Sequence, residues 1–189
     1  MSEEKLEEIF IDAEDRMEKA VEATQRELNS LRAGRAHPSL LDRLEVSAYE
    51  TKLPLRQVAN VTATDARTLT ITPYDKSIIK NIERAIMESD LGIMPQSDGQ
   101  KIHLNIPPLT EERRRELVKL AHKIAEDGRV ALRNIRRDAN DHIKKLEKGG
   151  EISEDLMHDA MEKVDKLLEK FKEQIEERLK QKEAEIMEV

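Results

Sequence analysis

The sequence predicts an α+β protein in which a long three-helix bundle carries a small β/α/β domain, inserted between the first and second helices. Three observations support this prediction. Towards both ends of the chain, apolar residues recur at alternating spacings of three and four, which is typical of amphipathic helices. Between residues 39 and 105 the period changes to the alternation of strands. Aromatic residues make up only 2% of the chain, so aliphatic side chains must fill both cores.

The first helix is predicted from an apolar stripe that begins at Leu6. Its further members are Phe10, Ala13, Met17, Ala20, Thr24, Leu28 and Leu31. At about 1.5 Å per residue, such a helix reaches roughly 45 Å. We expect it to end near Gly34, because glycine and the following Pro38 both disfavour continuation.

The inserted domain is predicted from shorter segments. Strands are expected at residues 44–49, 58–61, 68–72 and 102–106. Residues 76–89 are expected to form the helix of this domain, with isoleucines along its buried side. Gly92, Pro95 and Gly99 indicate a plain loop that connects this helix to the last strand.

Two more long helices are predicted after the insert. Thr110, followed by Glu111 and Glu112, is a suitable N-cap for the second helix, which should end at Gly149-Gly150. Its predicted apolar face consists of Leu117, Ala121, Ile124, Gly128, Ala131, Ile135, Ala139, Ile143 and Leu146. Ser153 is expected to cap the third helix, along Leu156, Ala160, Val164, Leu167, Phe171, Ile175, Leu179 and Ile186.

These elements define two domains and two crossings between them. We expect the bundle to comprise residues 1–30 and 106–189, and the inserted domain residues 31–105. Two short connections side by side predict a hinge, formed by Arg32, Ala33, Gly34, Arg35, Asn105, Ile106, Pro107 and Pro108.

Charge is unevenly distributed along the chain. The formal net charge is -7, yet residues 106–150 hold 12 basic and 8 acidic side chains, while residues 1–30 and 151–189 are strongly acidic. On the second predicted helix, the basic residues lie about 80 to 180 degrees from Gly128, beside the apolar face. We call this set the cationic ridge: Arg115, Lys119, His122, Arg129, Arg133, Arg136, Arg137 and Lys144.

The cationic ridge has two interpretations. Rows of guanidinium groups suit phosphate oxygens, because each offers a planar set of donors and keeps its charge at any working pH. Alternatively, these side chains pair with the acidic first and third helices across the bundle. The excess of basic residues in the segment suggests that part of the ridge remains available to RNA.

Sequence features of an enzyme are sparse. The absence of cysteine excludes thiolate nucleophiles and Cys-based zinc sites, and no phosphate-binding glycine loop occurs. The five histidines lack metal-ligand spacing. Asp138 and Asp141 are candidates for metal-dependent phosphodiester chemistry, but salt bridges are the preferred explanation on so charged a helix. We therefore expect a non-enzymatic protein without cofactor or metal.

Targeting features are equally sparse. The acidic N-terminus does not resemble a signal peptide, and no run of about 18 apolar residues occurs. A cytoplasmic protein without contact to a membrane is therefore expected.

Several long motifs occur in one order along the chain. They are residues 31–42 (LRAGRAHPSLLD), 54–59 (PLRQVA), 89–92 (SDLG), 107–114 (PPLTEERR) and 129–141 (RVALRNIRRDAND). On these motifs the chain resembles the ribosome recycling factor family over essentially its whole length. It departs from the usual family pattern at residues 47–53.

The resemblance implies an L-shaped, monomeric protein that works with a GTPase. In this family the bundle binds ribosomal RNA across the A and P sites of the large subunit. The small domain faces elongation factor G, whose GTP hydrolysis drives the splitting of post-termination ribosomes. Carried over, Arg129, Arg133 and Arg136 would hold the RNA, with Arg137, Arg115, Lys119 and Lys144 beside them. A helical scaffold that binds partner helices is the alternative without RNA.

Overall fold

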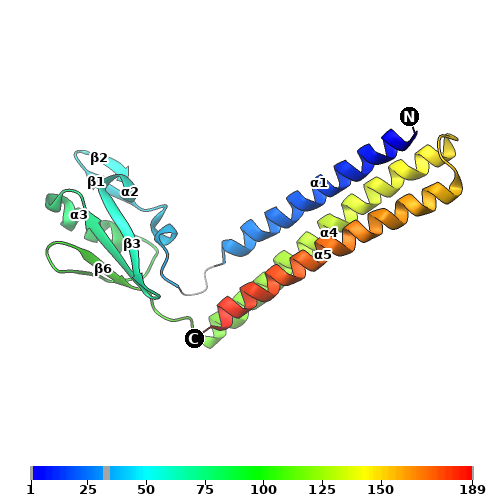
Figure 1. Cartoon of the computed structure of the whole chain (residues 1–189). Coiled ribbons are helices and arrows are strands. Elements are labelled where there is room, and N and C mark those ends of the chain that lie inside the picture. Colours follow the sequence, from blue (N-terminus) through cyan, green and yellow to red (C-terminus); the bar gives the residue numbers. More distant parts are fainter. Residues whose placement is uncertain (1, 32–34, 189) are drawn as a thin grey trace. The chain divides into compact units, whose positions relative to one another are not determined.

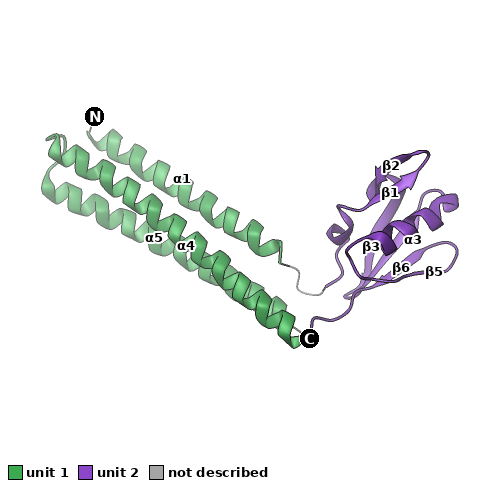
Figure 2. Ribbon diagram, turned by 180° about the vertical axis from the view of Figure 1, so that it is seen from behind, with its two compact units in different colours: residues 1–32, 111–188 green, residues 33–110, 189 purple. Residues whose placement is uncertain are grey.

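The computed structural model describes residues 2–31 and 35–188, which belong to two compact units (Figure 2). Unit 1 comprises residues 1–32 and 111–188, and unit 2 comprises residues 33–110. Three long helices make up unit 1, while sheets and short helices make up unit 2, which confirms the α+β fold class. The bundle was predicted to resume at residue 106, but unit 1 resumes at residue 111.

Unit 1 is a bundle of three helices that lie side by side along their length (Figure 1). They are α1 (Ser2–Asn29), α4 (Glu111–Lys148) and α5 (Glu154–Met187). The hydroxyl of Ser153 accepts a hydrogen bond from the backbone N–H of Leu156 at 3.1 Å, so the predicted cap of α5 is confirmed. Helix α4 starts immediately after Thr110 and stops before Gly149, as expected.

Helix α1 ends earlier than predicted. Its last residue is Asn29, whereas the sequence indicated an end near Gly34. The Ser30 hydroxyl donates to the carbonyl of Glu27, and the Ser30 N–H bonds to Arg26 and Glu27. These bonds close the last turn, because a serine side chain competes with helical backbone pairing. Gly34 itself lies outside the described residues.

The buried faces of α4 and α5 are rotated slightly from the predicted ones. Ala125 and Leu132 are buried on α4, while Ile124 and Ala131 are half-buried. On α5, Leu168 is buried and its neighbour Leu167 is half-buried. Adjacent apolar residues satisfy a helical period almost equally well, so only the position of the neighbouring helices selects between them.

Gly128 permits the closest approach in the bundle core. A Cβ atom added there would lie 2.4 Å from the Thr24 hydroxyl and 3.1 Å from Cδ1 of Ile175. Thr24 donates its hydroxyl to the carbonyl of Ala20 at 2.9 Å, so it remains satisfied although it is buried. The absent side chain therefore lets α4 pack tightly against both α1 and α5.

Unit 2 consists of a hairpin, a four-stranded sheet and short helices (Figure 1). Strands β1 (Glu45–Ala48) and β2 (Thr51–Pro54) form the antiparallel hairpin. The sheet has the order β3-β4-β6-β5, all antiparallel, with β3 (Ala59–Asp65), β4 (Thr68–Pro73), β5 (Pro95–Ser97) and β6 (Ile102–Asn105). The helices are η1 (Pro38–Leu41), α2 (Leu55–Val58), η2 (Lys76–Ile78) and α3 (Ile79–Glu88).

Two strands were missed and one was predicted too short. Strand β2 has only four residues and β5 has three, which is too few to display an alternating pattern. Pro95 occupies the edge strand β5, a position that proline tolerates because no ladder partner needs its missing N–H. Strand β3 extends to Asp65, four residues beyond the predicted end at Val61, through residues that are exposed.

Aliphatic residues of the sheet, the hairpin and α3 form the core of unit 2. Both chain crossings are held at the β3–β4 turn of this unit. The Ala36 N–H donates to the carbonyl of Ala66 at 2.8 Å, and the Ile106 N–H donates to the carbonyl of Arg67 at 2.7 Å. Residues 35 to 106 therefore belong structurally to unit 2, which explains why the bundle resumes later than predicted.

Candidate nucleic-acid interface

The cationic ridge of α4 divides into two rows. The inner row, Arg129 and Arg136, is half-buried and carries its charge towards α5. The outer row, which we define as Arg133, Arg137 and Lys144, is exposed on the side of α4 that is turned away from the core. Both interpretations from the sequence therefore apply, each to a different part of the ridge.

Arg129 is the most constrained member of the inner row. Its Nε donates to Glu126 at 2.8 Å, its Nη1 donates to Glu176 of α5, and only 17% of its side chain is exposed. Burial alone would lower the pKa of Arg129, but the hydrogen bonds and charges of Glu126 and Glu176 outweigh burial and raise it. Arg129 thus stays charged while it links α4 to α5.

Two more members of the ridge pair with α5. Arg136 Nη1 lies 3.7 Å from a carboxylate oxygen of Asp165, and His122 contacts Glu183. Pairing across the bundle is therefore confirmed for Arg129, Arg136 and His122. These contacts hold acidic α5 against the basic side of α4.

Among the described residues, the outer row forms fewer ion pairs within the protein than the inner row. Arg133 donates to Glu126 at 2.8 Å, and Arg137 donates only to the amide oxygen of Asn134 at 3.0 Å. Arg137 and Lys144 form no ion pair with any residue in the described part of the chain. Two cations on one exposed face are thus available to an anion from outside the protein.

At the start of α4, Arg115 donates to Glu111 one turn earlier at 2.7 Å, with both side chains largely exposed. Such a pair contributes little to stability and can open at small cost. Lys119 has no ion pair within residues 2–31 and 35–188. The structure thus places both predicted residues on the surface, about three to four turns before the two rows.

Glu126 accepts hydrogen bonds from one arginine of each row. Hydrogen bonds from Arg133, and then from Arg129, lower the pKa of the Glu126 carboxyl below its ordinary value. The carboxylate is consequently ionised at neutral pH and competes with any external phosphate for Arg133. Arg137 and Lys144 face no such competitor.

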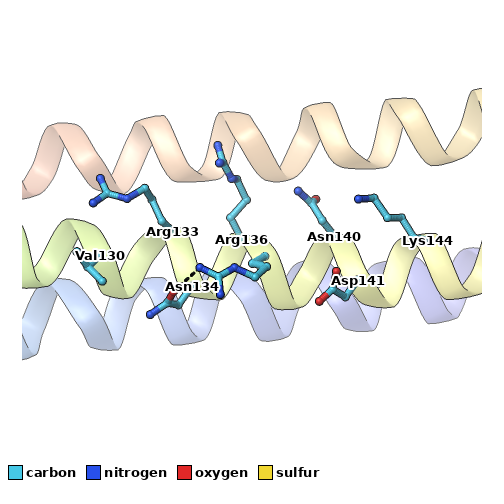
Figure 3. Close-up of a pocket in the computed structure, with 8 residues that line it drawn as sticks. Val130, Arg133, Asn134, Arg136, Asn140, Asp141 and Lys144 are labelled. Carbon is cyan, nitrogen blue, oxygen red and sulfur yellow. Dashed lines mark hydrogen bonds between the residues drawn. The ribbon is translucent and has the colours of Figure 1, made fainter.

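A shallow depression of about 310 Å³ lies along the outer row (Figure 3). Four of its lining residues are members of the ridge, and the others are Val130, Asn134, Asn140 and Asp141. Figure 3 shows Arg133, Arg136, Asn140 and Lys144 on the side towards α5, and Val130, Asn134 and Asp141 on the opposite side. The depression thus has cationic side chains towards α5, and on the opposite side Val130, Asp141 and Asn134, the last of which accepts from Arg137.

Reasoning from the sequence had missed Val130, Asn134 and Asn140. None of these residues is charged, so the charge pattern of the helix does not indicate them. For Val130 and Asn134 the spacing contains a signal, because residues 130, 134, 137 and 141 follow each other at intervals of three and four on a single helix face. Asn140 lies outside this series. Residues between the charges of a basic helix face are therefore worth including in a predicted interface.

Asp138 and Asp141, the candidates for metal-dependent chemistry, are both exposed on α4. Asp138 accepts a hydrogen bond from Arg16 of α1 at 3.1 Å, so the predicted salt bridge is confirmed for that residue. Within residues 2–31 and 35–188, no group of three or more His, Asp and Glu side chains is placed to hold a metal ion. Over the same residues, no helix combines the length and apolar character needed to cross a membrane.

The predicted hinge residues are only partly described. Arg32, Ala33 and Gly34 lie outside the described residues, and Arg35 is exposed. Asn105 is the last residue of β6, and Ile106 is bonded to the β3–β4 turn, whereas Pro107 and Pro108 are exposed and belong to no helix or strand. A hinge at these crossings remains a prediction.

Comparison with known proteins gives one consistent result. The family model described as ribosome recycling factor matches residues 24–187. Proteins named ribosome-recycling factor are similar: one from Shouchella clausii is 54% identical over 96% of this chain and 98% of its own length. Another, from Thermosynechococcus vestitus, is 57% identical over 94% and 98% of the two chains.

Solved structures agree with the sequence comparisons. A solution structure of a ribosome recycling factor matches with a TM-score of 0.70 and 41% identity, covering 98% of both chains. A second match has a TM-score of 0.60 and 43% identity over 96% of this chain and 98% of the other. It describes models for the T. thermophilus ribosome recycling factor and E. coli elongation factor G bound to the E. coli post-termination complex. With a family model matching most of its length and relatives above 50% identity, this chain belongs to the ribosome recycling factor family.

Proposed function

We propose that this protein binds the large ribosomal subunit across its A and P sites and, with elongation factor G and GTP, splits post-termination ribosomes. It acts in the cytoplasm as a monomer and makes no covalent change itself. Membership of the family supports the proposal, as do the models of a relative and of elongation factor G bound to a post-termination complex.

The exposed cations of the outer row are the main structural support for this proposal. Arg137 and Lys144 are exposed, lie on one face of a rigid helix and have no carboxylate partner among the described residues. Exposed cations in a row lower the free energy of binding to RNA by replacing counterions at phosphates. We propose that Arg133, Arg137 and Lys144 contact RNA directly, with Arg115 and Lys119 extending the contact along α4.

The inner row has a different role in this proposal. Arg129 and Arg136 already pair with α5, so they stiffen the bundle and contribute to RNA binding mainly through their positive potential. A stiff bundle suits a lever, because force applied at one end is then transmitted without bending. Close packing at Gly128 contributes to the same stiffness.

Unit 2 is proposed to face elongation factor G. Hydrogen bonds at Ala36 and Ile106 make residues 35–106 one structural element with the sheet. Rotation between the units would then be absorbed by the few residues outside that element, including Pro107 and Pro108. A translocase that pushes unit 2 would turn it about this hinge.

The experiment is sedimentation of post-termination ribosomes with elongation factor G and GTP, at two salt concentrations. We expect the wild-type protein to release free subunits, and Arg137→Ala to require a higher protein concentration for the same release. Lys172→Ala is the matched control, because Lys172 is an exposed cation of α5 that forms no ion pair with any described residue and lies off the ridge. The control should release subunits as the wild type does.

Two results would contradict the proposal. If the wild-type protein neither binds nor splits ribosomes with a matched translocase, the recycling function is wrong for this chain. If binding is insensitive to salt and equal in Arg137→Ala, the contact is not electrostatic, and apolar binding of partner helices would take its place.

A further inference from the structure

We propose that the depression beside the outer row receives one unpaired nucleotide of ribosomal RNA, with its base against Val130 and Asn134 and its phosphate among the cations. The inference rests on the proposed function, because it names the part of the RNA that this surface holds. It goes beyond phosphate binding, since a base contact distinguishes one RNA site from another.

The size of the depression fits one base. Its volume of about 310 Å³ is at the lower end of the roughly 300 to 1,000 Å³ found for pockets that hold small organic molecules. A double helix would meet a helix face as a broad surface, whereas single-stranded bases can turn outward and enter a small hollow. The hollow therefore favours an unpaired base.

The lining has the two halves that a nucleotide requires. Towards α5 lie the cations Arg133, Arg136 and Lys144, which suit a phosphate (Figure 3). On the opposite side lie Val130, Asn134 and Asp141, which carry no positive charge themselves, with the Arg137 guanidinium bonded to Asn134. Binding of a phosphate alone would not involve the side chains of Val130, Asn134 and Asp141.

Val130 supplies an apolar contact. Its side chain is 41% exposed on a helix whose other outward residues are mostly charged or amide-bearing. A methyl-bearing surface gains nothing from a phosphate, but it gains by covering the apolar face of a base. The guanidinium of Arg137, beside it in the depression, can stack on the same base.

Asn134 is held ready to contact a base edge. Arginine has only hydrogen-bond donors, so the Asn134 amide atom that meets Arg137 at 3.0 Å must be the oxygen. The amide NH₂ of Asn134 is therefore directed away from Arg137 and offers two donors. Asp141, on the same side, offers acceptors for an exocyclic amino group.

Asn140 provides an independent observation. Its Oδ1 atom is buried and has no hydrogen-bond partner among the described residues, although Asn140 lines the depression. Exchanging the amide atoms would only leave the NH₂ group unpaired at the same place. A buried polar atom without a partner costs free energy, so rotation of this amide towards a bound nucleotide is favoured.

The test measures binding to isolated large subunits between 50 and 200 mM salt, together with base-specific chemical modification of the ribosomal RNA. Asn134→Ala should weaken binding about 5- to 100-fold, as for the loss of a base contact, without changing the salt dependence. Val130→Ser should weaken binding in the same way. Lys144→Ala should instead lower the slope of log affinity against log salt by about one.

The modification pattern gives a second readout. One base that wild-type protein protects should regain its reactivity when Asn134→Ala is bound. Asn29→Ala is the matched control, because Asn29 is an exposed asparagine of α1 whose amide oxygen likewise accepts one side-chain hydrogen bond. Circular dichroism and thermal unfolding should show that each variant retains the helical fold.

The outcomes separate this inference from the proposed function. If Asn134→Ala and Val130→Ser bind as wild type does and no single base is protected, while Lys144→Ala changes the salt slope, binding involves phosphates alone. The nucleotide site is then wrong and the proposed function stands. If wild-type protein does not bind large subunits at all, both are wrong.

Discussion

The inner and outer rows of α4 both consist of basic side chains, but the inner row pairs with α5 and the outer row is exposed. Arg129 and Arg133 are one helical turn apart and share Glu126, yet Arg129 also reaches Glu176 and is largely buried, whereas Arg133 is about half exposed. A rotation of about 40 degrees around the helix, four residues at 100 degrees each, separates them. Position relative to α5 therefore decides whether an arginine stabilises the bundle or remains available to bind RNA.

Removal of the outer row should have the largest effect on binding. In Arg133→Ala/Arg137→Ala/Lys144→Ala, we expect affinity for the large subunit to fall on the order of 100-fold, with a salt slope lower by about two to three. The free energy of unfolding should change by less than about 0.5 kcal/mol, because these side chains are exposed. Binding titrations over a range of salt concentrations and urea unfolding measure the two quantities. A loss of stability comparable to the loss of affinity would contradict the division into rows.

A substitution on the core side of α4 should lower stability and leave the salt dependence of RNA binding unchanged. Gly128→Ala places a methyl group 2.4 Å from the Thr24 hydroxyl, and such overpacking costs about 1 to 3 kcal/mol. Thermal unfolding should show the loss, while the salt slope of RNA binding stays unchanged. The double variant Thr24→Ala/Gly128→Ala removes the obstructing hydroxyl and should recover part of the stability. If the double variant is no more stable than Gly128→Ala alone, the close approach to Thr24 is not the cause.

Arg129→Ala tests the inner row itself. We expect a loss of about 1 to 2 kcal/mol in the free energy of unfolding, because the packed stem is removed together with its hydrogen bonds to Glu126 and Glu176. Arg129→Met keeps most of the stem, so it should recover the packing part of that loss. The salt slope of RNA binding should change less than in Arg137→Ala. An equal change in slope would show that Arg129 contacts phosphate despite its burial.

The helical part of the fold was predictable because long amphipathic stripes contain many repeats of one signal. Ser153 and Thr110 were recognised as helix starts for the same local reason, since the capping chemistry lies within a few residues. Strands β2 and β5 were not predictable, because their existence depends on partners far away in the sequence. Pro95, for example, pairs with Leu104, and no local pattern indicates that pairing.

The sequence predicted the positive charge of the candidate site, but not its division into an inner and an outer row. The sequence placed all seven cations of the proposed RNA site on one side of α4, and the structure bears out their location on that helix. It did not separate Arg129 from Arg133, because the separation depends on where Glu176 of α5 lies. Asn134 and Asn140 were not predictable, because the role of an uncharged side chain depends on the neighbours that the fold places beside it.

The smallest predicted effect concerns Glu126, which joins the two rows. Its pKa is lowered in the folded protein by Arg133 and Arg129, so its contribution to stability is present above the ordinary carboxyl pKa. That contribution is lost as the pH falls through the lowered pKa of the folded state, because protonation then removes the charge. Glu126→Gln should therefore be slightly less stable than wild type near neutral pH, and the difference should disappear in acid. Thermal unfolding of both proteins across this range measures it.

Glu126→Gln should also release Arg133 from its carboxylate partner. The freed guanidinium can then meet a phosphate without first breaking an ion pair, so affinity for the large subunit should rise a few-fold at neutral pH. Glu116→Gln is the matched control, because Glu116 accepts from Arg113, which is not part of the ridge. A stability difference that persists unchanged in acid would show that the shape of the glutamate side chain, and not its charge, couples the two rows.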